Sequence, residues 1–197
     1  MTILHISDTH NHHRQLHDLP KADVIVHSGD FTFAGTEDEA MDFVKWFCEL
    51  PYAHKIFIAG NHDYCLYGAD INGLSDNVHY LYGNGVTIDG LRFFGIPMFM
   101  EDNISGDYDK MLRCIPSDTD IFITHQPPYG ILDKSGHIHF GNKILCDMVN
   151  QTKPKTHLFG HIHVASGLYH KDGVIYSNAV LVGEEYELCH SPHLIEL

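Results

Sequence analysis

Short apolar runs alternate with a helical period in the first third of the chain. The runs at residues 3–7, 24–28 and 55–59 are nearly continuous in apolar, often β-branched, side chains, which is typical of strands buried on both faces. Between the second and third runs, capping-box spacing followed by apolar residues on one face predicts a helix over residues 36–50. Strand, helix and strand in this order predict an open α/β sheet, which binds ligands at the carboxyl ends of its strands.

The pattern changes after about residue 78. Three short strand-like segments follow one another there, at residues 78–81, 86–88 and 91–96. The pair Asp89-Gly90 between the last two segments favours a hairpin turn. We therefore expect an antiparallel meander and a second sheet. Residues 97–103 are acidic and show no clear period, and we expect Glu101 and Asp102 to be solvated.

Two further strands of the buried type are expected at residues 120–124 and 156–159. An amphipathic helix is expected between them, over residues 142–152, and it ends before a proline. The last strands, at residues 174–177 and 194–197, are expected to join the second sheet.

Composition narrows the class of protein. The chain has 197 residues, of which 44% are hydrophobic and 19% charged, and we expect one globular domain over residues 1–197. The start of the sequence does not show the pattern of a secretion leader, and we expect none; no apolar run is long enough for a membrane helix. The five cysteines are widely spaced without a CxxC pair, so reduced thiols and a cytoplasmic location are expected.

Charge argues against general nucleic-acid binding. The formal net charge of −14 provides no basic surface with which to displace counterions from a phosphate backbone. A phosphate-containing substrate would therefore have to be attracted locally, and bound divalent metal ions would serve this purpose.

Residue types that bind metal ions follow each of the five buried-type strands. The candidates at these strand ends are Asp8, His10, Asp30, Asn61, His62, His125, His161 and His163. One such residue alone would be a weak signal, because Asp and Asn are also common in turns. Repetition at five strand ends makes a shared metal site the stronger interpretation.

The mixture of ligand types indicates which ions would bind. Because no cysteine stands at these strand ends, a zinc-thiolate site is excluded, and His with Asp and Asn suits Mn²⁺, Fe or Zn²⁺ better than Ca²⁺. The candidates exceed what one ion takes, which favours two ions sharing a carboxylate, the arrangement that promotes in-line displacement at phosphorus. If Asp8 and Asp30 are the only anionic ligands, two divalent ions and a bridging hydroxide leave a local charge of about +1.

The same residues resemble a known family. They stand in the order of the five motifs of the calcineurin-like metallophosphoesterases, as Asp8-Thr9-His10, Gly29-Asp30, Gly60-Asn61-His62-Asp63, His125 and Gly160-His161-Ile162-His163. The longer stretches SDTH, HSGDFT, LPYAHKIFIAGNHD, THQPP and LFGHIH are similar to the MPPED branch, whose members resemble class III cyclic nucleotide phosphodiesterases.

The resemblance implies an αββα sandwich of two mixed sheets flanked by helices, with the site at one edge of the sheets. It further implies three groups of metal ligands: Asp8, His10 and His163 on the first ion, Asn61, His125 and His161 on the second, and Asp30 as the bridge. His62 would act on the leaving oxygen as a general acid or by stabilising charge there.

Two positions bear on how complete the site is. Many relatives carry an acidic residue three after the bridging aspartate, where it orients the catalytic histidine, but this chain has Phe33. Asp63 directly follows His62, and adjacent side chains rarely face one another, so the residue that orients His62 stays open. Some MPPED members have glycine where this chain has His161, whose presence favours a complete second site.

His161 and His163 are expected to bind different ions. On an extended backbone the two imidazoles would lie on the same side and about two strand residues apart. That separation is closer to the distance between two metal ions than to that between two ligands of one ion.

The predicted function is hydrolysis of a small phosphodiester, with a cyclic nucleotide as one candidate, by a hydroxide that bridges the two ions. Phe31, Tyr64 and Tyr67 are candidate walls of the substrate cleft. A phosphomonoesterase, a protein phosphatase or a nuclease using the same site are alternatives within the enzyme class. A metal-binding interaction module without catalysis and a metal-storage protein are alternatives of other classes; the first predicts missing ligands and the second histidine tracts, and neither is found.

Overall fold

Neighbouring residues of one strand pack in different layers of the fold. In β2 (Val24–His27), Val24 and Val26 belong to an apolar layer that joins both sheets, whereas Ile25 packs with residues of helix α1 (Glu37–Glu49). This follows from the two-residue period of side chains in a strand. A strand covered on both sides is therefore mostly apolar, which explains the long apolar runs in the sequence; the buried His27 is the exception within β2.

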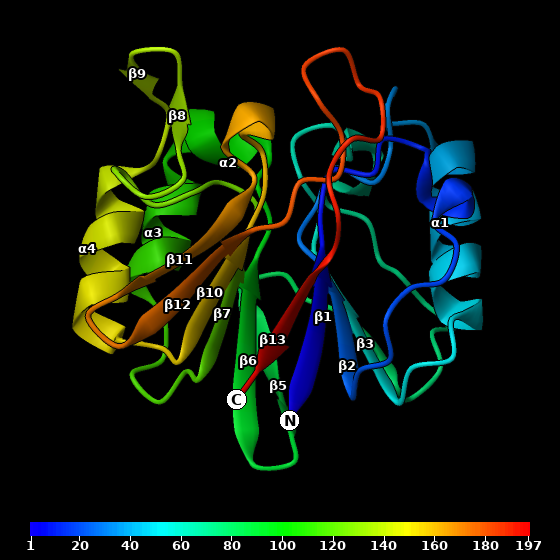
Figure 1. Cartoon of the computed structure of the whole chain (residues 1–197), viewed down its shortest axis with the longest axis horizontal. Helices are drawn as coiled ribbons and strands as arrows, with labels where there is room; N and C mark the ends of the chain where they lie inside the picture. The colour runs from blue at the N-terminus through cyan, green and yellow to red at the C-terminus, as the bar shows by residue number, and fades with distance from the viewer.

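The computed structural model describes all 197 residues, and its helices lie outside two sheets that pack face to face (Figure 1). Helix α1 covers one sheet, and α3 (Asp107–Arg113) and α4 (Lys143–Thr152) cover the other. The two mixed sheets with flanking helices confirm the expected αββα sandwich. No helix combines the length and the apolarity that a membrane crossing requires.

The first sheet has five strands. Their order is β13 (His193–Glu196), β1 (Thr2–Ile6), β2, β3 (His54–Phe57) and β4 (Val78–Tyr80), and only the pair of β13 and β1 is antiparallel. Two expectations were wrong here, because β4 and β13 were expected in the second sheet. β4 instead continues the parallel series beside β3, and β13 adds an antiparallel edge beside β1.

The second sheet has six strands and is also mixed. Their order is β11 (Gly167–Lys171), β12 (Val174–Asn178), β10 (Thr156–Phe159), β7 (Ile121–Thr124), β6 (Leu91–Ile96) and β5 (Asn84–Ile88). The hairpin of β5 and β6 is antiparallel as expected, but β6, β7, β10 and β12 run parallel. A separate small hairpin joins β8 (Lys134–Ser135) to β9 (Ile138–His139).

Residues 97–113 contain two short helices that the sequence did not reveal. Helix α2 (Met100–Ser105) and helix α3 meet at Gly106, and each is too short to show a helical period. Asp102 was expected to be solvated but is buried, and it accepts a hydrogen bond of 2.7 Å from the Tyr82 hydroxyl. Three single-turn 3-10 helices complete the fold, η1 (His13–Gln15), η2 (Tyr64–Leu66) and η3 (His163–Ala165).

Candidate metal centre

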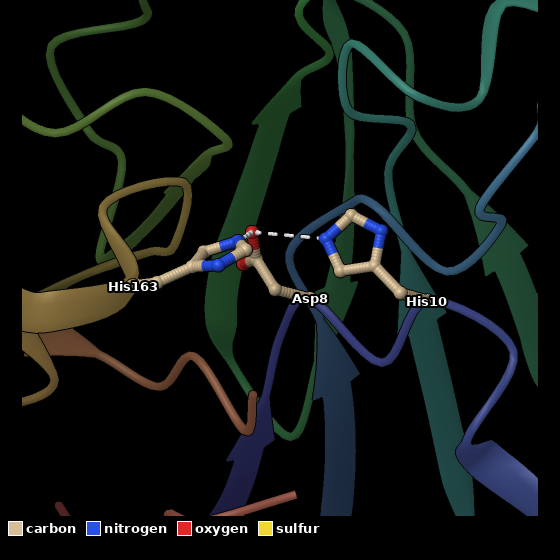
Figure 2. Close-up of side chains that lie close together, drawn as sticks. All are labelled: Asp8, His10 and His163. Atoms are coloured by element: carbon tan, nitrogen blue, oxygen red, sulfur yellow. Dashed lines mark ion pairs between the residues drawn. The ribbon is translucent and has the colours of Figure 1, made fainter. Parts of the chain in front are cut away.

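The loops after β1 and β10 bring Asp8, His10 and His163 together. Figure 2 shows both imidazoles turned toward the Asp8 carboxylate. Asp8 Oδ1 lies 3.5 Å from His163 Nε2 and 4.0 Å from His10 Nε2. One ligand atom from each of the three residues lies within 4.8 Å of the ligand atoms of the other two, so these residues can share one ion. This is the first predicted ligand group.

Asp30, His125 and His161 form a second group with the same spacing. Asp30 Oδ2 lies 3.2 Å from His125 Nε2 and 3.9 Å from His10 Nε2. Asp30 therefore faces both groups, as a bridging ligand must. Asn61 lines the same cavity as Asp30 and His161, so the structure brings all seven predicted ligands to one place.

Two buried atoms of this cluster, His10 Nε2 and Asn61 Oδ1, have no hydrogen-bond partner in the protein, and a third, His125 Nε2, faces the Asp30 carboxylate at 3.2 Å. Most buried polar atoms in proteins are hydrogen-bonded, and an unpartnered one costs free energy. Such atoms beside buried carboxylates fit metal coordination, because a cation would satisfy them all. The nitrogen and oxygen donors also match the ligand types of Mn²⁺, Fe and Zn²⁺.

Backbone carbonyls hold three of the imidazoles in position. His10 Nδ1 lies 3.0 Å from the Thr32 carbonyl, His125 Nδ1 2.9 Å from the Ser28 carbonyl, and His163 Nδ1 2.9 Å from the Gly183 carbonyl. A carbonyl only accepts, so each Nδ1 carries the proton and donates. The Nε2 lone pair is thereby left for a metal ion, as is usual for metal-binding histidines.

Four of the seven predicted ligands have a left-handed backbone conformation. The φ angles are +51° at Asp8, +39° at His10, +56° at Asp30 and +74° at His161. Such angles are uncommon outside glycine, although Asp and His tolerate them better than most residues, and they cluster at functional sites. The chain therefore turns sharply at these positions and does not continue as a strand.

Two motif glycines allow the backbone to approach the carboxylates. A Cβ atom at Gly60 would collide with the Asp30 carboxylate, and one at Gly160 would collide with the Asp8 carboxylate and the Ser7 hydroxyl. The His161 backbone N–H, next to Gly160, donates to Asp8 Oδ2 at 3.0 Å. Glycine at these positions thus fixes each carboxylate against the main chain.

The charges of the cluster already attract a positive charge. Burial lowers the pKa of His125, but Asp30 and Asp8 raise it more strongly, to about 10. Burial and the neighbouring His125 lower the pKa of His161 to about 4. In the metal-free protein near neutral pH, His125 therefore holds a proton where a metal ion would bind, and His161 is neutral and ready to coordinate.

Metal binding is therefore expected to release a proton. His125 must lose its Nε2 proton to coordinate, so below pH 10 the apparent affinity of the second site should rise about tenfold per pH unit. Calorimetric titration with Mn²⁺ in two buffers of different protonation enthalpy measures the proton released. A binding enthalpy that is the same in both buffers would contradict this assignment.

The main-chain carbonyl of Phe33 orients His62. His62 Nδ1 lies 2.9 Å from this carbonyl, which resolves the question left open by the missing acidic side chain at residue 33. Asp63 does not take that role. It is buried and accepts hydrogen bonds from the backbone N–H groups of Asp30, Thr32 and Gly60 at 2.8 to 2.9 Å, so it ties two ligand loops together.

Geometry alone allows His62 two roles. Its ring lies 4.7 Å from that of His10, centroid to centroid, and one of its nitrogens fits within 4.8 Å of ligand atoms of His10 and Asp30. His62 also lines the cavity at the cluster, where a substrate would meet it. Its assignment as a catalytic residue and not a ligand stays a prediction.

The cluster opens into a cavity of about 370 Å³. The cavity is lined by Asp30, Asn61, His62, Ser135, Phe140, His161, Ile162, His163, Val164, Glu184 and Tyr186. None of the three predicted aromatic walls is among these residues. Phe31 was the clearest error, because it is fully buried and stacks on Phe43 with ring centroids 4.0 Å apart.

Tyr64 and Tyr67 also lie outside the cavity lining. The Tyr64 hydroxyl donates to the Ala34 carbonyl at 2.6 Å, and the Tyr67 ring packs on Phe99 with centroids 5.4 Å apart. The actual walls, such as Phe140 and Tyr186, come from loops far along the chain. No signal at a strand end could have identified them, because the tertiary fold alone brings these loops to the cluster.

Comparison with known proteins agrees with this geometry. The model of the family described as calcineurin-like phosphoesterase matches residues 1–165. UPF0046 protein K07C11.7 of Caenorhabditis elegans is 33% identical, over 91% of this chain and 69% of that protein. The human metallophosphoesterase domain-containing protein 1 is 30% identical, over 98% of this chain and 69% of that protein.

A solved structure shares the fold over nearly the full length of both chains. It superposes with a TM-score of 0.69 at 15% identity, over 99% of this chain and 98% of the other. The resemblance inferred from the five motifs, including the MPPED branch, is thus confirmed. The chain belongs to the calcineurin-like phosphoesterase family, a family of metal-dependent phosphoesterases with dinuclear centres.

Proposed function

We propose that this protein hydrolyses small phosphodiesters at a centre of two divalent metal ions, with Mn²⁺ as the ion of choice and Fe or Zn²⁺ as alternatives. The observation that carries the proposal is the set of buried ligand atoms gathered with Asp8 and Asp30: His10 Nε2 and Asn61 Oδ1 have no hydrogen-bond partner, and His125 Nε2 faces the Asp30 carboxylate. A cyclic nucleotide is one small diester of this class. The five unpaired cysteines support a reducing compartment, and we assign the activity to the cytoplasm.

Bound metal ions would supply Lewis-acid stabilisation of charge on phosphorus and a nucleophile at neutral pH. The chain supplies the rest. Asp8, His10 and His163 would hold one ion, Asn61, His125 and His161 the other, and Asp30 would contact both. His62 donates its Nδ1–H to the Phe33 carbonyl; with a second proton on Nε2, as the imidazolium, it would give that proton to the departing oxygen and be left as neutral imidazole.

Charge around the cavity favours diesters over monoesters. Lysine and arginine are absent from the lining, and Glu184 adds a negative charge at the rim. A phosphodiester carries one negative charge, whereas a monoester carries nearly two at neutral pH because its second pKa is about 6. The second charge of a monoester would find no lysine or arginine in the cavity lining, and Glu184 would repel it.

We therefore expect kcat/KM for bis(p-nitrophenyl) phosphate to exceed that for p-nitrophenyl phosphate at least about tenfold. Glu184→Lys should lower the ratio of diester to monoester kcat/KM about threefold or more. The main cause should be a higher kcat/KM for the monoester, since the substitution reverses a charge at the rim. Glu185→Lys is the matched control, because Glu185 is exposed in the same loop but does not line the cavity. Equal ratios in the two variants would exclude a role for Glu184.

The test of the function itself is turnover of bis(p-nitrophenyl) phosphate by protein reconstituted with Mn²⁺. Activity should need the metal and disappear with a chelator. An interaction module without catalysis would show no turnover even in protein that holds metal, so metal content measured beside activity separates these two functions.

A further inference from the structure

Phe33 exposes an apolar ring next to the predicted catalytic histidine. Half of its side chain is exposed, and its ring centroid lies 6.4 Å from that of His62. Only the main-chain carbonyl of Phe33 holds His62, so the side chain is not needed for that contact. A large apolar side chain exposed beside a reaction centre is a common feature of ligand-binding sites.

Tyr186 completes an aromatic corner with Phe33. The two rings meet edge to face, with centroids 5.2 Å apart and an interplanar angle of 83°. Tyr186 also packs edge-on against His10 at 4.8 Å and His163 at 5.2 Å, and it lines the cavity. The corner thus stands between the first ligand group and the surface.

The backbone of Tyr186 is strained. Its φ angle is +61°, a left-handed conformation that is a genuine outlier for a bulky residue. The turn is fixed by the Tyr186 N–H, which donates to the Gly183 carbonyl at 3.1 Å. The same carbonyl accepts from His163 Nδ1, so one loop both orients a metal ligand and aims the tyrosine ring at the cavity.

We propose that Phe33 and Tyr186 form a platform for the leaving group of the substrate, and that the preferred substrates are phosphodiesters whose leaving alcohol carries a planar, apolar group. This inference rests on the proposed function, in which the leaving oxygen departs toward His62. A group attached to that oxygen would lie beside His62. Phe33 is not itself part of the cavity lining, but its half-exposed ring lies next to two residues that are, His62 and Tyr186. Stacking on an aromatic side chain would then contribute to specificity.

Binding of two matched monoanions tests the platform without requiring turnover. Phenyl methylphosphonate and methyl methylphosphonate have the same charge and differ only in the phenyl or methyl group on the ester oxygen. Calorimetry on protein reconstituted with Mn²⁺ should give a Kd about tenfold lower for the phenyl compound. Phe33→Ala should reduce this preference to about threefold or less and leave the Kd of the methyl compound unchanged.

Two further variants make the outcome specific. Phe33→Tyr keeps the ring and should retain the preference, and Tyr169→Ala, at an exposed position of β11 outside the cavity, should match the wild type. An unchanged preference in Phe33→Ala would overturn the platform, as would equal weakening of both compounds, which would indicate a displaced His62. Hydrolysis of bis(p-nitrophenyl) phosphate by the wild type tests the proposed function separately from the platform. If the wild type does not hydrolyse this diester, the proposed function is overturned, whatever the binding preference.

Discussion

Asp30→Asn is expected to remove metal from both positions and to reduce hydrolysis of bis(p-nitrophenyl) phosphate by about a thousandfold or more. Asp30 Oδ2 lies within 4 Å of both His10 Nε2 and His125 Nε2, so its charge serves both ligand groups. Asparagine preserves the shape and can still accept the hydrogen bond that the His62 N–H donates to Asp30 Oδ1. What is lost is one of two anionic ligands, and with it several kcal/mol of stabilisation of transition-state charge.

Metal analysis and activity should be measured on the same protein sample. Asp102→Asn is a matched control, because Asp102 is also buried but bonds to Tyr82 away from the cluster. The control should keep two ions per chain and wild-type turnover. If Asp30→Asn also kept two ions and full activity, Asp30 could not be the bridge.

His62→Ala is expected to keep both metal ions and to lose turnover by about a hundredfold to ten-thousandfold, the usual range for removal of a general acid. The reason is the position of His62, which lines the cavity and is held by the Phe33 carbonyl. Two groups of predicted ligands form without it. Steady-state kinetics together with metal content distinguishes a catalytic residue from a ligand.

The leaving group provides a second readout for His62. A good leaving group such as p-nitrophenolate needs little protonation, so the loss should be larger for diesters of ordinary alcohols. His137→Ala, at an exposed position in the loop between β8 and β9, controls for the removal of any histidine. Loss of metal together with turnover would assign His62 to the group that contains His10 and Asp30.

The ends of the buried strands were sufficient to select the candidate ligands. Strands buried on both faces are mostly apolar, so Asp8, Asp30 or His125 at the end of such a run stands out. Parallel strands bring their carboxyl ends to one edge of a sheet, whereas the meeting of two sheets at one site and the division of the ligands between two ions were implied by the resemblance to the family. The metal assignments themselves stay predictions.

The geometric reason given for separating His161 from His163 was wrong, although the structure does place them in different groups. The backbone is not extended there. His161 has a φ of +74° and His163 begins η3, so a turn separates the imidazoles and strand alternation does not. A left-handed residue in such a turn is stabilised by surrounding contacts, including the bond from the His161 N–H to Asp8, which a local pattern does not contain.

The other residues and strands that the sequence did not place correctly also depend on tertiary contacts. Phe31 was expected to be a wall of the cleft, but the chain turns at Asp30 and the Phe31 side chain lies in the core. Tyr186 lies on a loop that only the tertiary fold brings to the cluster. The order of β4 and β13 in the sheets depends on pairing between distant segments, which hydrophobic pattern does not specify.

Anomalous diffraction from crystals of the Mn²⁺-loaded protein tests the central claim most directly. Data collected at the manganese absorption edge should show two peaks about 3.5 to 4 Å apart. His163 Nε2 should coordinate the ion shared with Asp8 and His10, His161 the ion shared with His125 and Asn61, and Asp30 should contact both. A single peak would contradict the account, and so would coordination of the same ion by His161 and His163.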